Sequence, residues 1–266
     1  MVQSVFRVTG SQVPDILIKA LVMDSLLRRV YNRLPPALAG VAGSIRYCGL
    51  PVPIRTARAN SLLSYINLFF LQELARRADV LNLRGDFVEC GVYRGGSAGV
   101  LGYHAMRSPF HRQLWLYDAF AGMPKATEED DDYSRSLENT FVGSESQTRQ
   151  ILHHLRVPET RYTIVRGWFE DTLPKATPGP VALLHIDCDF YAPVKLTLET
   201  FYRSVEPGGF IILNDYGAFA GCKTATNEFL INQKADVQLI QIDHEAYYFQ
   251  KPERAIATLG STPGES

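Results

Sequence analysis

The sequence predicts an α/β fold whose sheet is doubly wound and mostly parallel. Short apolar stretches with the character of buried strands alternate with helical stretches in four successive units. Such alternation favours a parallel sheet with helices on both faces. Two further strand-like stretches, 237–242 and 246–250, flank Asp243-His244-Glu245 and predict an antiparallel hairpin. We therefore expect a Rossmann-like sheet that ends in a C-terminal hairpin.

Composition and charge narrow the class of protein. Of the 266 residues, 46% are hydrophobic and 21% are charged, which is typical of a globular protein with a large core. The net charge of −1 gives no basic surface for nucleic acid or for an anionic membrane. The sequence has no bilayer-spanning apolar run and no signal-peptide pattern, so we expect no stable membrane insertion. The four cysteines (48, 90, 188 and 222) form no C-x-x-C pair, which favours reduced thiols in a cytoplasmic protein.

Three parts are expected along the chain. They are an N-terminal helical and irregular appendage or lid over 1–57, a main domain over 58–254 and a flexible tail over 255–266. Within the first part, 15–34 has the spacing of an amphipathic helix, and an irregular stretch with glycines and prolines follows it. Packing of this helix on the core, on a partner or over a pocket is favoured, and binding to a membrane surface is the alternative. Together with the apolar stripe of a helix over 61–78, it predicts a homodimer or larger oligomer.

A glycine-rich stretch between the first predicted strand and the next helix is the first candidate ligand site. The strand ends at Glu89, and Gly91, Gly95 and Gly96 form the turn. Glycine has no Cβ, so the backbone can approach a ligand closely, and free N–H groups at the helix start would face it. The spacing is neither G-x-G-x-x-G nor a P-loop, which disfavours a pyrophosphate. An acid beside the turn instead suits a ligand that carries an ammonium group and a ribose, such as S-adenosylmethionine. The alternative is that the glycines serve only to pack the turn tightly within the protein.

The ends of the second and third predicted strands extend this site. The second strand, 113–117, ends at Asp118, about 20 residues beyond the turn, where an acid binds ribose hydroxyls in dinucleotide folds. An ordinary turn residue is the alternative. The loop that follows, with Phe120, is placed to wall the cofactor. The third strand, 162–165, leads to Gly167, Trp168 and Phe169, whose aromatic rings would either sandwich adenine or join the core.

Five consecutive acids at 128–132 lie between these two strands. They lack the ligand spacing of a calcium-binding loop. We therefore expect a solvated, flexible loop near the mouth of the site.

Polar side chains follow two later strands that are expected to be neighbours. Asp187 and Asp189 follow the strand 181–186, and Asn214-Asp215 follows the strand 210–213, which a Pro-Gly-Gly turn precedes. Carboxyl ends of parallel strands meet at one edge of the sheet. Asp187, Asn214 and Asp215 offer hard oxygen ligands that suit Mg²⁺, while a turn-capping role for Asn214-Asp215 is the alternative. His185 is interpreted as a core histidine.

Four motifs in this order resemble the macrocin O-methyltransferase family, whose members methylate sugar hydroxyls of macrolide and aminocoumarin natural products. The motifs are Asp86-Phe-Val-Glu-Cys-Gly-Val-Tyr-Arg-Gly-Gly-Ser97, Tyr117-Asp-Ala-Phe-Ala-Gly-Met-Pro124, Leu184-His-Ile-Asp-Cys-Asp-Phe-Tyr191 and Asn214-Asp-Tyr-Gly217. The resemblance covers residues 58–250. It implies a class I methyltransferase fold, S-adenosylmethionine, a divalent cation and a small hydroxylated acceptor. The family usually has two aspartates where this sequence has Asn214-Asp215.

Residue roles follow from the motifs and this resemblance. Asp189 is the expected general base, with His185 as the alternative, and Asp187, Asn214 and Asp215 are the expected metal ligands. The expected cofactor-binding residues are Glu89, Gly91, Tyr93, Gly95, Gly96, Ser97, Asp118, Phe120, Gly167, Trp168, Phe169 and Asp187. Two alternative functions stay open. A dehydrogenase of the NAD type is disfavoured by the glycine spacing and by the lack of a Tyr-x-x-x-Lys pair, and a non-catalytic binding module is disfavoured by the intact acids.

Overall fold

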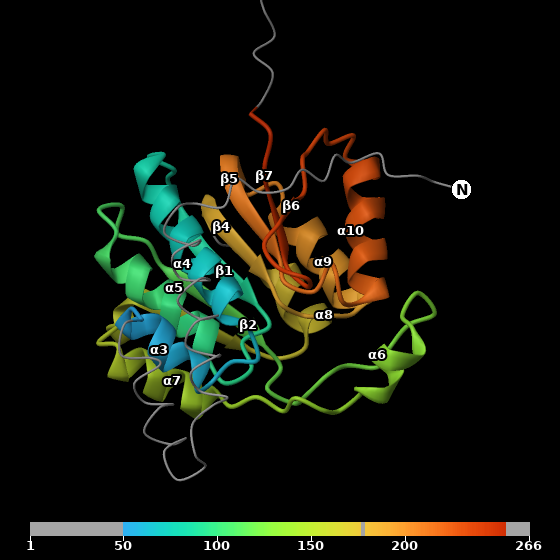
Figure 1. Cartoon of the computed structure of the whole chain (residues 1–266), viewed down its shortest axis with the longest axis horizontal. Helices are drawn as coiled ribbons and strands as arrows, with labels where there is room; N and C mark the ends of the chain where they lie inside the picture. The colour runs from blue at the N-terminus through green and yellow to red at the C-terminus, as the bar shows by residue number, and fades with distance from the viewer. Residues whose placement is uncertain (1–49, 177–178, 254–266) are drawn as a thin grey trace, which may run out of the picture.

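The computed structural model describes residues 50–176 and 179–253, which form one mixed sheet between two layers of helices (Figure 1). The strand order is β3-β2-β1-β4-β5-β7-β6. Strands β1 to β5 are parallel, and β7 pairs antiparallel with both β5 and β6. The predicted fold class, including the C-terminal hairpin, is confirmed. The strands are β1 (Asp86–Cys90), β2 (Leu114–Asp118), β3 (Tyr162–Arg166), β4 (Val181–Ile186), β5 (Val205–Leu213), β6 (Ile240–Gln241) and β7 (Tyr247–Gln250).

The helices divide between the two faces of the sheet (Figure 1). One layer holds α3 (Val52–Arg58), α4 (Tyr65–Val80), α5 (Gly96–Arg107) and α7 (Glu145–His154). The opposite layer holds α8 (Phe169–Thr172), α9 (Tyr191–Phe201) and α10 (Ala220–Asn232). The short helix α6 (Asp132–Ser136) lies on an arm that extends from the sheet toward the lower right of Figure 1. Among the described residues there are also two 3₁₀ turns, Glu159–Arg161 and Leu173–Lys175.

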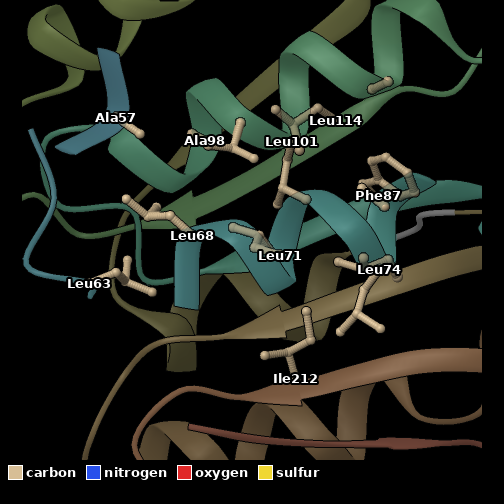
Figure 2. Packing of buried hydrophobic residues seen from close by; sticks show 14 of the residues in the cluster. Ala57, Leu63, Leu68, Leu71, Leu74, Phe87, Ala98, Leu101, Leu114 and Ile212 are labelled. Carbon is tan, nitrogen blue, oxygen red and sulfur yellow. The ribbon is translucent and has the colours of Figure 1, made fainter. Parts of the chain in front are cut away.

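Helix α4 forms the centre of the first layer because its apolar stripe faces both the sheet and α5. Leu68 of α4 lies beside Ala98 of α5, and Leu71 lies between Leu101 of α5 and Ile212 of β5 (Figure 2). These side chains are fully buried. Truncating a leucine in such a setting costs about 2–5 kcal/mol, so Leu71 fixes this layer on the sheet.

The first turn of α4 is tied to the C-terminal hairpin. Ser64 caps the helix, and its Oγ accepts a hydrogen bond of 3.0 Å from the backbone N–H of Asn67. The same hydroxyl donates to Asp243 Oδ2 at 2.5 Å, in the turn between β6 and β7. The position of Asn67 is therefore fixed relative to the edge of the sheet.

The direction of winding reverses between β1 and β4, which are neighbours in the sheet. In open α/β sheets, ligands bind at the carboxyl ends of the strands at this switch point. Gly91 has a φ of +92°, and a Cβ added to it would lie 1.7 Å from the Asp187 carbonyl oxygen. The Asp187 N–H donates to Cys90 O at 2.9 Å. Only glycine allows this approach, and the approach brings the glycine turn against the loop that carries the predicted metal ligands.

Two elements differ from the sequence predictions. The stretch before residue 58, expected to be irregular, contains α3, because Pro53 occupies the first helical turn, where its missing N–H costs nothing. Ile54 and Ala57 of this helix are fully buried in the core. The expected turn 207–209 is part of β5, which begins at Val205 and is irregular in its pairing with β4 at this point. The N–H of Gly208 donates to the carbonyl of Lys251, and the N–H of Lys251 donates to the carbonyl of Gly209.

The acidic run 128–132 is also more ordered than predicted. The side chain of Asp130 is buried, and its Oδ1 accepts a hydrogen bond of 2.9 Å from the N–H of Tyr191 at the start of α9. Asp131 caps α6 by accepting from the N–H of Ser134. The expectation of a solvated loop was therefore wrong for Asp130, which is buried, whereas Asp131 is exposed as expected but is held by its cap on α6.

The expected helix over 15–34 and the tail 255–266 lie outside the described residues. Within the part that the structure describes, no helix is both long enough and apolar enough to cross a membrane.

Candidate active site

Asp118, at the end of β2, holds the glycine turn in place. Its Oδ2 accepts hydrogen bonds from the backbone N–H groups of Val92 and Tyr93 at 2.6 and 2.8 Å. Its Oδ1 accepts from the N–H of Phe120 at 2.6 Å. The predicted ribose-binding acid is thus also a structural brace for the turn, which the sequence prediction missed. A carboxylate oxygen has two acceptor sites, so Oδ1 keeps one for a ligand.

Three strand ends carry a residue with left-handed backbone. Tyr93, Phe120 and Asp189 have φ values of +54°, +53° and +58°, within three residues of the ends of β1, β2 and β4. This conformation is unusual for residues other than glycine and costs about 1–3 kcal/mol where the surrounding structure enforces it. Such strain is concentrated at functional sites. All three residues belong to the predicted site.

The remaining glycines of the turn are enclosed by protein. A Cβ on Gly95 would lie 2.6 Å from Thr148 Cα in α7, and one on Gly96 would lie 2.5 Å from Ser61 Cβ. Ser97, in the first turn of α5, is buried. Close packing against α7 and the segment after α3 is therefore sufficient to require glycine at both positions, and contact with a cofactor stays a prediction for them.

Glu89, predicted to face a ligand beside the glycine turn, lies inside the protein. Strand alternation directs its side chain to the layer of α4 and α5, and it is fully buried together with His185 of β4. Glu89 Oε1 and His185 Nδ1 are 3.0 Å apart. Glu89 Oε2 and His185 Nε2 have no hydrogen-bond partner among the described residues. His185 is thus a core histidine with one paired ring nitrogen, and contact of Glu89 with a ligand would require its neighbours to move.

The two aromatic residues after β3 separate. Phe169 is buried in the core, whereas Trp168 is 37% exposed. Gly167 directly follows β3 and precedes both aromatic residues. Its N–H donates to the carbonyl of Asp118 at 3.0 Å, which places Trp168 beside the end of β2. The two predicted alternatives, contact with adenine and packing in the core, therefore apply to different rings. Phe169 packs in the core, and of the two rings only Trp168 is exposed enough to contact a ligand.

A cavity of about 420 Å³ opens on this side of the sheet. Phe120 and Arg166, at the ends of β2 and β3, form one wall, and the first turns of α7 form the other. The acids of β4 and β5 do not line it. It therefore lies on the predicted cofactor side of the site.

The four polar residues that follow β4 and β5 come together. Asn214 Nδ2 donates to Asp187 Oδ1 at 2.7 Å and to Asp215 Oδ1 at 3.1 Å. The backbone N–H of Asp189 donates to Asp215 Oδ2 at 3.1 Å. Asn214 and Asp215 are buried, whereas Asp187 and Asp189 are partly exposed. The predicted metal ligands and the predicted base thus form one cluster at the switch point.

Burial makes ionisation of these acids costly. It raises the pKa of Asp187 well above its ordinary value, and the charge of Asp215 raises it further. Burial also raises the pKa of Asp189, with Asp215 and Asp187 adding to the effect. The pKa of Asp215 is raised to about 6 by burial, although hydrogen bonds from Asp189 and Asn214 oppose this. Closely spaced acids with raised pKa values, for which the described residues provide no ion pair, take up protons or bind a cation.

The donor set of this cluster suits a hard divalent cation. Asp187 and Asp215 supply carboxylate oxygens that both accept from the same amide nitrogen of Asn214, and the Asn214 amide also carries an oxygen. The amide presents its nitrogen to the acids in this structure, and the amide oxygen faces away from them. Among the described residues, no group of three or more His, Cys, Asp or Glu side chains is arranged to hold a metal ion. Any cation here would thus depend on two carboxylates and the amide of Asn214.

Asn67 is a member of this site that sequence analysis missed. It is 1% exposed, lies in the first turn of α4 and donates its Nδ2 to Asn214 Oδ1. The sequence signal was a polar amide within the apolar stripe of this helix, three residues after the capping serine, although this signal does not identify the partner of the amide.

Comparison with known proteins assigns the family. The model of the family described as Macrocin-O-methyltransferase (TylF) matches residues 43–251, which is most of the chain. The chain belongs to the macrocin O-methyltransferase family. This assignment confirms the resemblance found in the four motifs and the enzyme class, an S-adenosylmethionine-dependent O-methyltransferase. It sets aside the NAD-type dehydrogenase and the non-catalytic module.

Macrocin O-methyltransferase family relatives include named natural-product enzymes. Demethyldecarbamoylnovobiocin O-methyltransferase of Streptomyces niveus is 29% identical over 204 residues, which are 73% of this chain and 77% of that protein. 8-Demethyl-8-(2,3-dimethoxy-α-L-rhamnosyl)-tetracenomycin-C 4'-O-methyltransferase of Streptomyces olivaceus is 31% identical over 154 residues, 54% of this chain and 58% of that protein. The solved structure of the O-methyltransferase NovP is 28% identical with a TM-score of 0.67, over 73% of this chain and 83% of that chain.

Proposed function

We propose that this enzyme methylates a sugar hydroxyl of a glycosylated natural product with the help of a divalent cation. The observation that carries the proposal is the convergence of Asp187, Asn214 and Asp215 beside the glycine turn, with raised carboxyl pKa values and no cationic side chain among them. The name of the S. olivaceus relative, which refers to a rhamnosyl compound, supports a sugar as the acceptor.

Positioning accounts for most of the catalysis in this proposal. S-adenosylmethionine, when bound, supplies the methyl group, and the chain must align it with one acceptor hydroxyl. Asp118 fixes the glycine turn through the N–H groups of Val92 and Tyr93, and it offers one free acceptor site to the ribose. Trp168 stands exposed beside it for the adenine. These groups hold the donor on the β1 and β2 side of the switch point.

Asp189 is the proposed base on the acceptor side. Its backbone is fixed by the hydrogen bond to Asp215, and its carboxyl is partly exposed next to the cluster. The raised pKa of Asp189 makes it a stronger proton acceptor than an ordinary aspartate. Asp187, Asn214 and Asp215 would hold the cation, which when bound would acidify the acceptor hydroxyl as a Lewis acid. His185 is less suited to the role, because it is fully buried beside Glu89.

An acceptor screen tests this function. The enzyme is incubated with labelled S-adenosylmethionine, Mg²⁺ and paired acceptors, each a glycoside and its free aglycone, with demethyldecarbamoylnovobiocin and its aglycone among them. We expect label on glycosides only, with fragmentation placing the methyl group on the sugar. Transfer to the aglycones at equal rates would contradict a sugar acceptor.

A further inference from the structure

We propose that Asn67 is a positioning residue that allows the Asn214 amide to turn, so that either its nitrogen or its oxygen can face Asp187 and Asp215. The inference rests on the proposed function, because it assumes that a cation binds between these acids. It adds a residue from α4, outside the strand-end motifs, to the machinery that prepares the site.

Asn67 is held firmly and makes one polar contact with the site. Its backbone N–H is bound by the capping Ser64, which is itself bound to Asp243. Its side chain is buried and donates Nδ2 to Asn214 Oδ1. Its own Oδ1 has no hydrogen-bond partner among the described residues. A buried, unpaired amide oxygen is costly, so its retention beside the cluster calls for a role.

The present orientation of Asn214 cannot serve a cation. Its Nδ2 donates to both Asp187 and Asp215, so its two N–H bonds point into the space between the acids that a cation would occupy. An amide nitrogen is a donor only, and a cation needs the amide oxygen. Asn214 must therefore turn its amide through half a rotation to become a ligand.

Asn67 can support both orientations of Asn214. After the rotation, Asn214 Nδ2 faces α4 and needs an acceptor, which the unpaired Oδ1 of Asn67 provides once that amide also turns. Either arrangement satisfies the Asn67–Asn214 bond and leaves one atom of Asn67 unpaired. The contact with Asn67 thus favours neither orientation. The occupant of the space between the acids selects the orientation: without a cation, Asn214 Nδ2 donates to both acids, and with a cation the amide oxygen is needed there.

Substitutions at Asn67 separate this role from simple packing. The variant Asn67→Leu has no acceptor for the rotated amide of Asn214, which therefore keeps its nitrogen toward the acids. Asn67→Asp accepts only, so it favours the rotated amide, with oxygen toward the acids. An aspartate at 214 offers oxygen in either orientation, and Asn214→Asp therefore removes the need for Asn67.

The test is a titration of the full chain with Mn²⁺, followed by the EPR signal of the free ion, without any acceptor. We expect Asn67→Leu to weaken Mn²⁺ binding at least tenfold and Asn67→Asp to tighten it at least tenfold. In the Asn214→Asp background, Asn67→Leu should change the affinity less than threefold. Binding of S-adenosylhomocysteine serves as the control for folding and should stay within twofold of the parent.

Each outcome decides the question. If the parent and Asn214→Asp both fail to bind Mn²⁺, the proposed cation site falls, and the role of Asn67 falls with it. If the parent binds Mn²⁺ but Asn67→Leu has parental affinity, or if the effect is equal in both backgrounds, only the role of Asn67 is overturned. If Asn67→Leu does not fold, Asn67→Asp, which preserves the size of the side chain, is compared in the parent and in the Asn214→Asp background. Equal tightening of Mn²⁺ binding in both backgrounds would show an effect of charge alone and would overturn the inference.

Discussion

The backbone N–H of Asp189 donates a hydrogen bond of 3.1 Å to Asp215 Oδ2, so the proposed base and a proposed metal ligand are one structural unit. The bond explains how Asp189 can keep its left-handed φ of +58°. Any movement of Asp215 would also move the base. The two residues follow different strands, β4 and β5, and the sheet fixes the distance between them.

Asp189→Asn should lower turnover by about two to four orders of magnitude, the usual contribution of a general base. Asparagine tolerates left-handed backbone and preserves the backbone bond to Asp215, so binding of cofactor and of Mn²⁺ should be unchanged. The measurement is kcat with a saturating glycoside acceptor, with calorimetric binding of S-adenosylhomocysteine as the control. Parental activity of this variant would assign the proton to another group.

Asp118→Ala should weaken binding of S-adenosylhomocysteine by about 1.5–3 kcal/mol, the scale of hydrogen bonds to a charged group. The loss combines the ribose contact with the brace to Val92 and Tyr93. Asp118→Asn keeps one oxygen acceptor and should fall between the parent and the alanine variant in calorimetry. Unchanged affinity of Asp118→Ala would refute both roles.

The sequence was most informative at the carboxyl ends of the strands. Parallel strands bring their ends to one edge, so short apolar runs and the polar residues after them were enough to bring Asp187, Asn214 and Asp215 together. The family motifs point to the same edge. Glycine spacing was less informative, because Gly95 and Gly96 meet Thr148 and Ser61, which lie on other elements.

The sequence could not predict contacts between groups that are distant along the chain. Asp130 looks solvated within five acids, yet Tyr191, 61 residues later, supplies the N–H that buries it. Asn67 lies within a helix stripe, and only the packing of α4 on the sheet brings it to Asn214. The oligomeric state and the role of residues 1–49 stay predictions of the sequence.

The contribution of Asp215 to the stability of the metal-free protein should fall as the pH rises from about 4 to about 6. The pKa of Asp215 is raised from 3.8 to about 6 in the folded protein, so the folded state binds the proton more tightly than the unfolded state does across this range. The expected loss is on the order of 1–3 kcal/mol, measured by denaturation in the presence of a chelator. Asp215→Asn should show a flatter dependence. A parent whose stability is constant or rises over this range, relative to Asp215→Asn, would contradict the raised pKa.

Asp130→Ala should destabilise the protein by about 0.5–2 kcal/mol, as the loss of a helix cap does. Asp130 acts as a cap for α9, whose own N-cap residue Phe190 provides no side-chain acceptor. Glu128→Ala, in the same acidic run but exposed, is the matched control and should change stability by less than about 0.5 kcal/mol. Equal denaturation midpoints for the two variants would mean that the buried contact is unimportant.

The central claim is that a cation bound by Asp187, Asn214 and Asp215 is needed for methyl transfer to a sugar hydroxyl. The most direct measurement is the rate of label transfer from S-adenosylmethionine to a glycoside acceptor, before and after chelation and after Mg²⁺ is restored. We predict that chelation abolishes transfer without releasing the cofactor, that Mg²⁺ restores it, and that Asp215→Ala stays inactive even with Mg²⁺. Transfer at the full rate in the chelated enzyme would contradict the account.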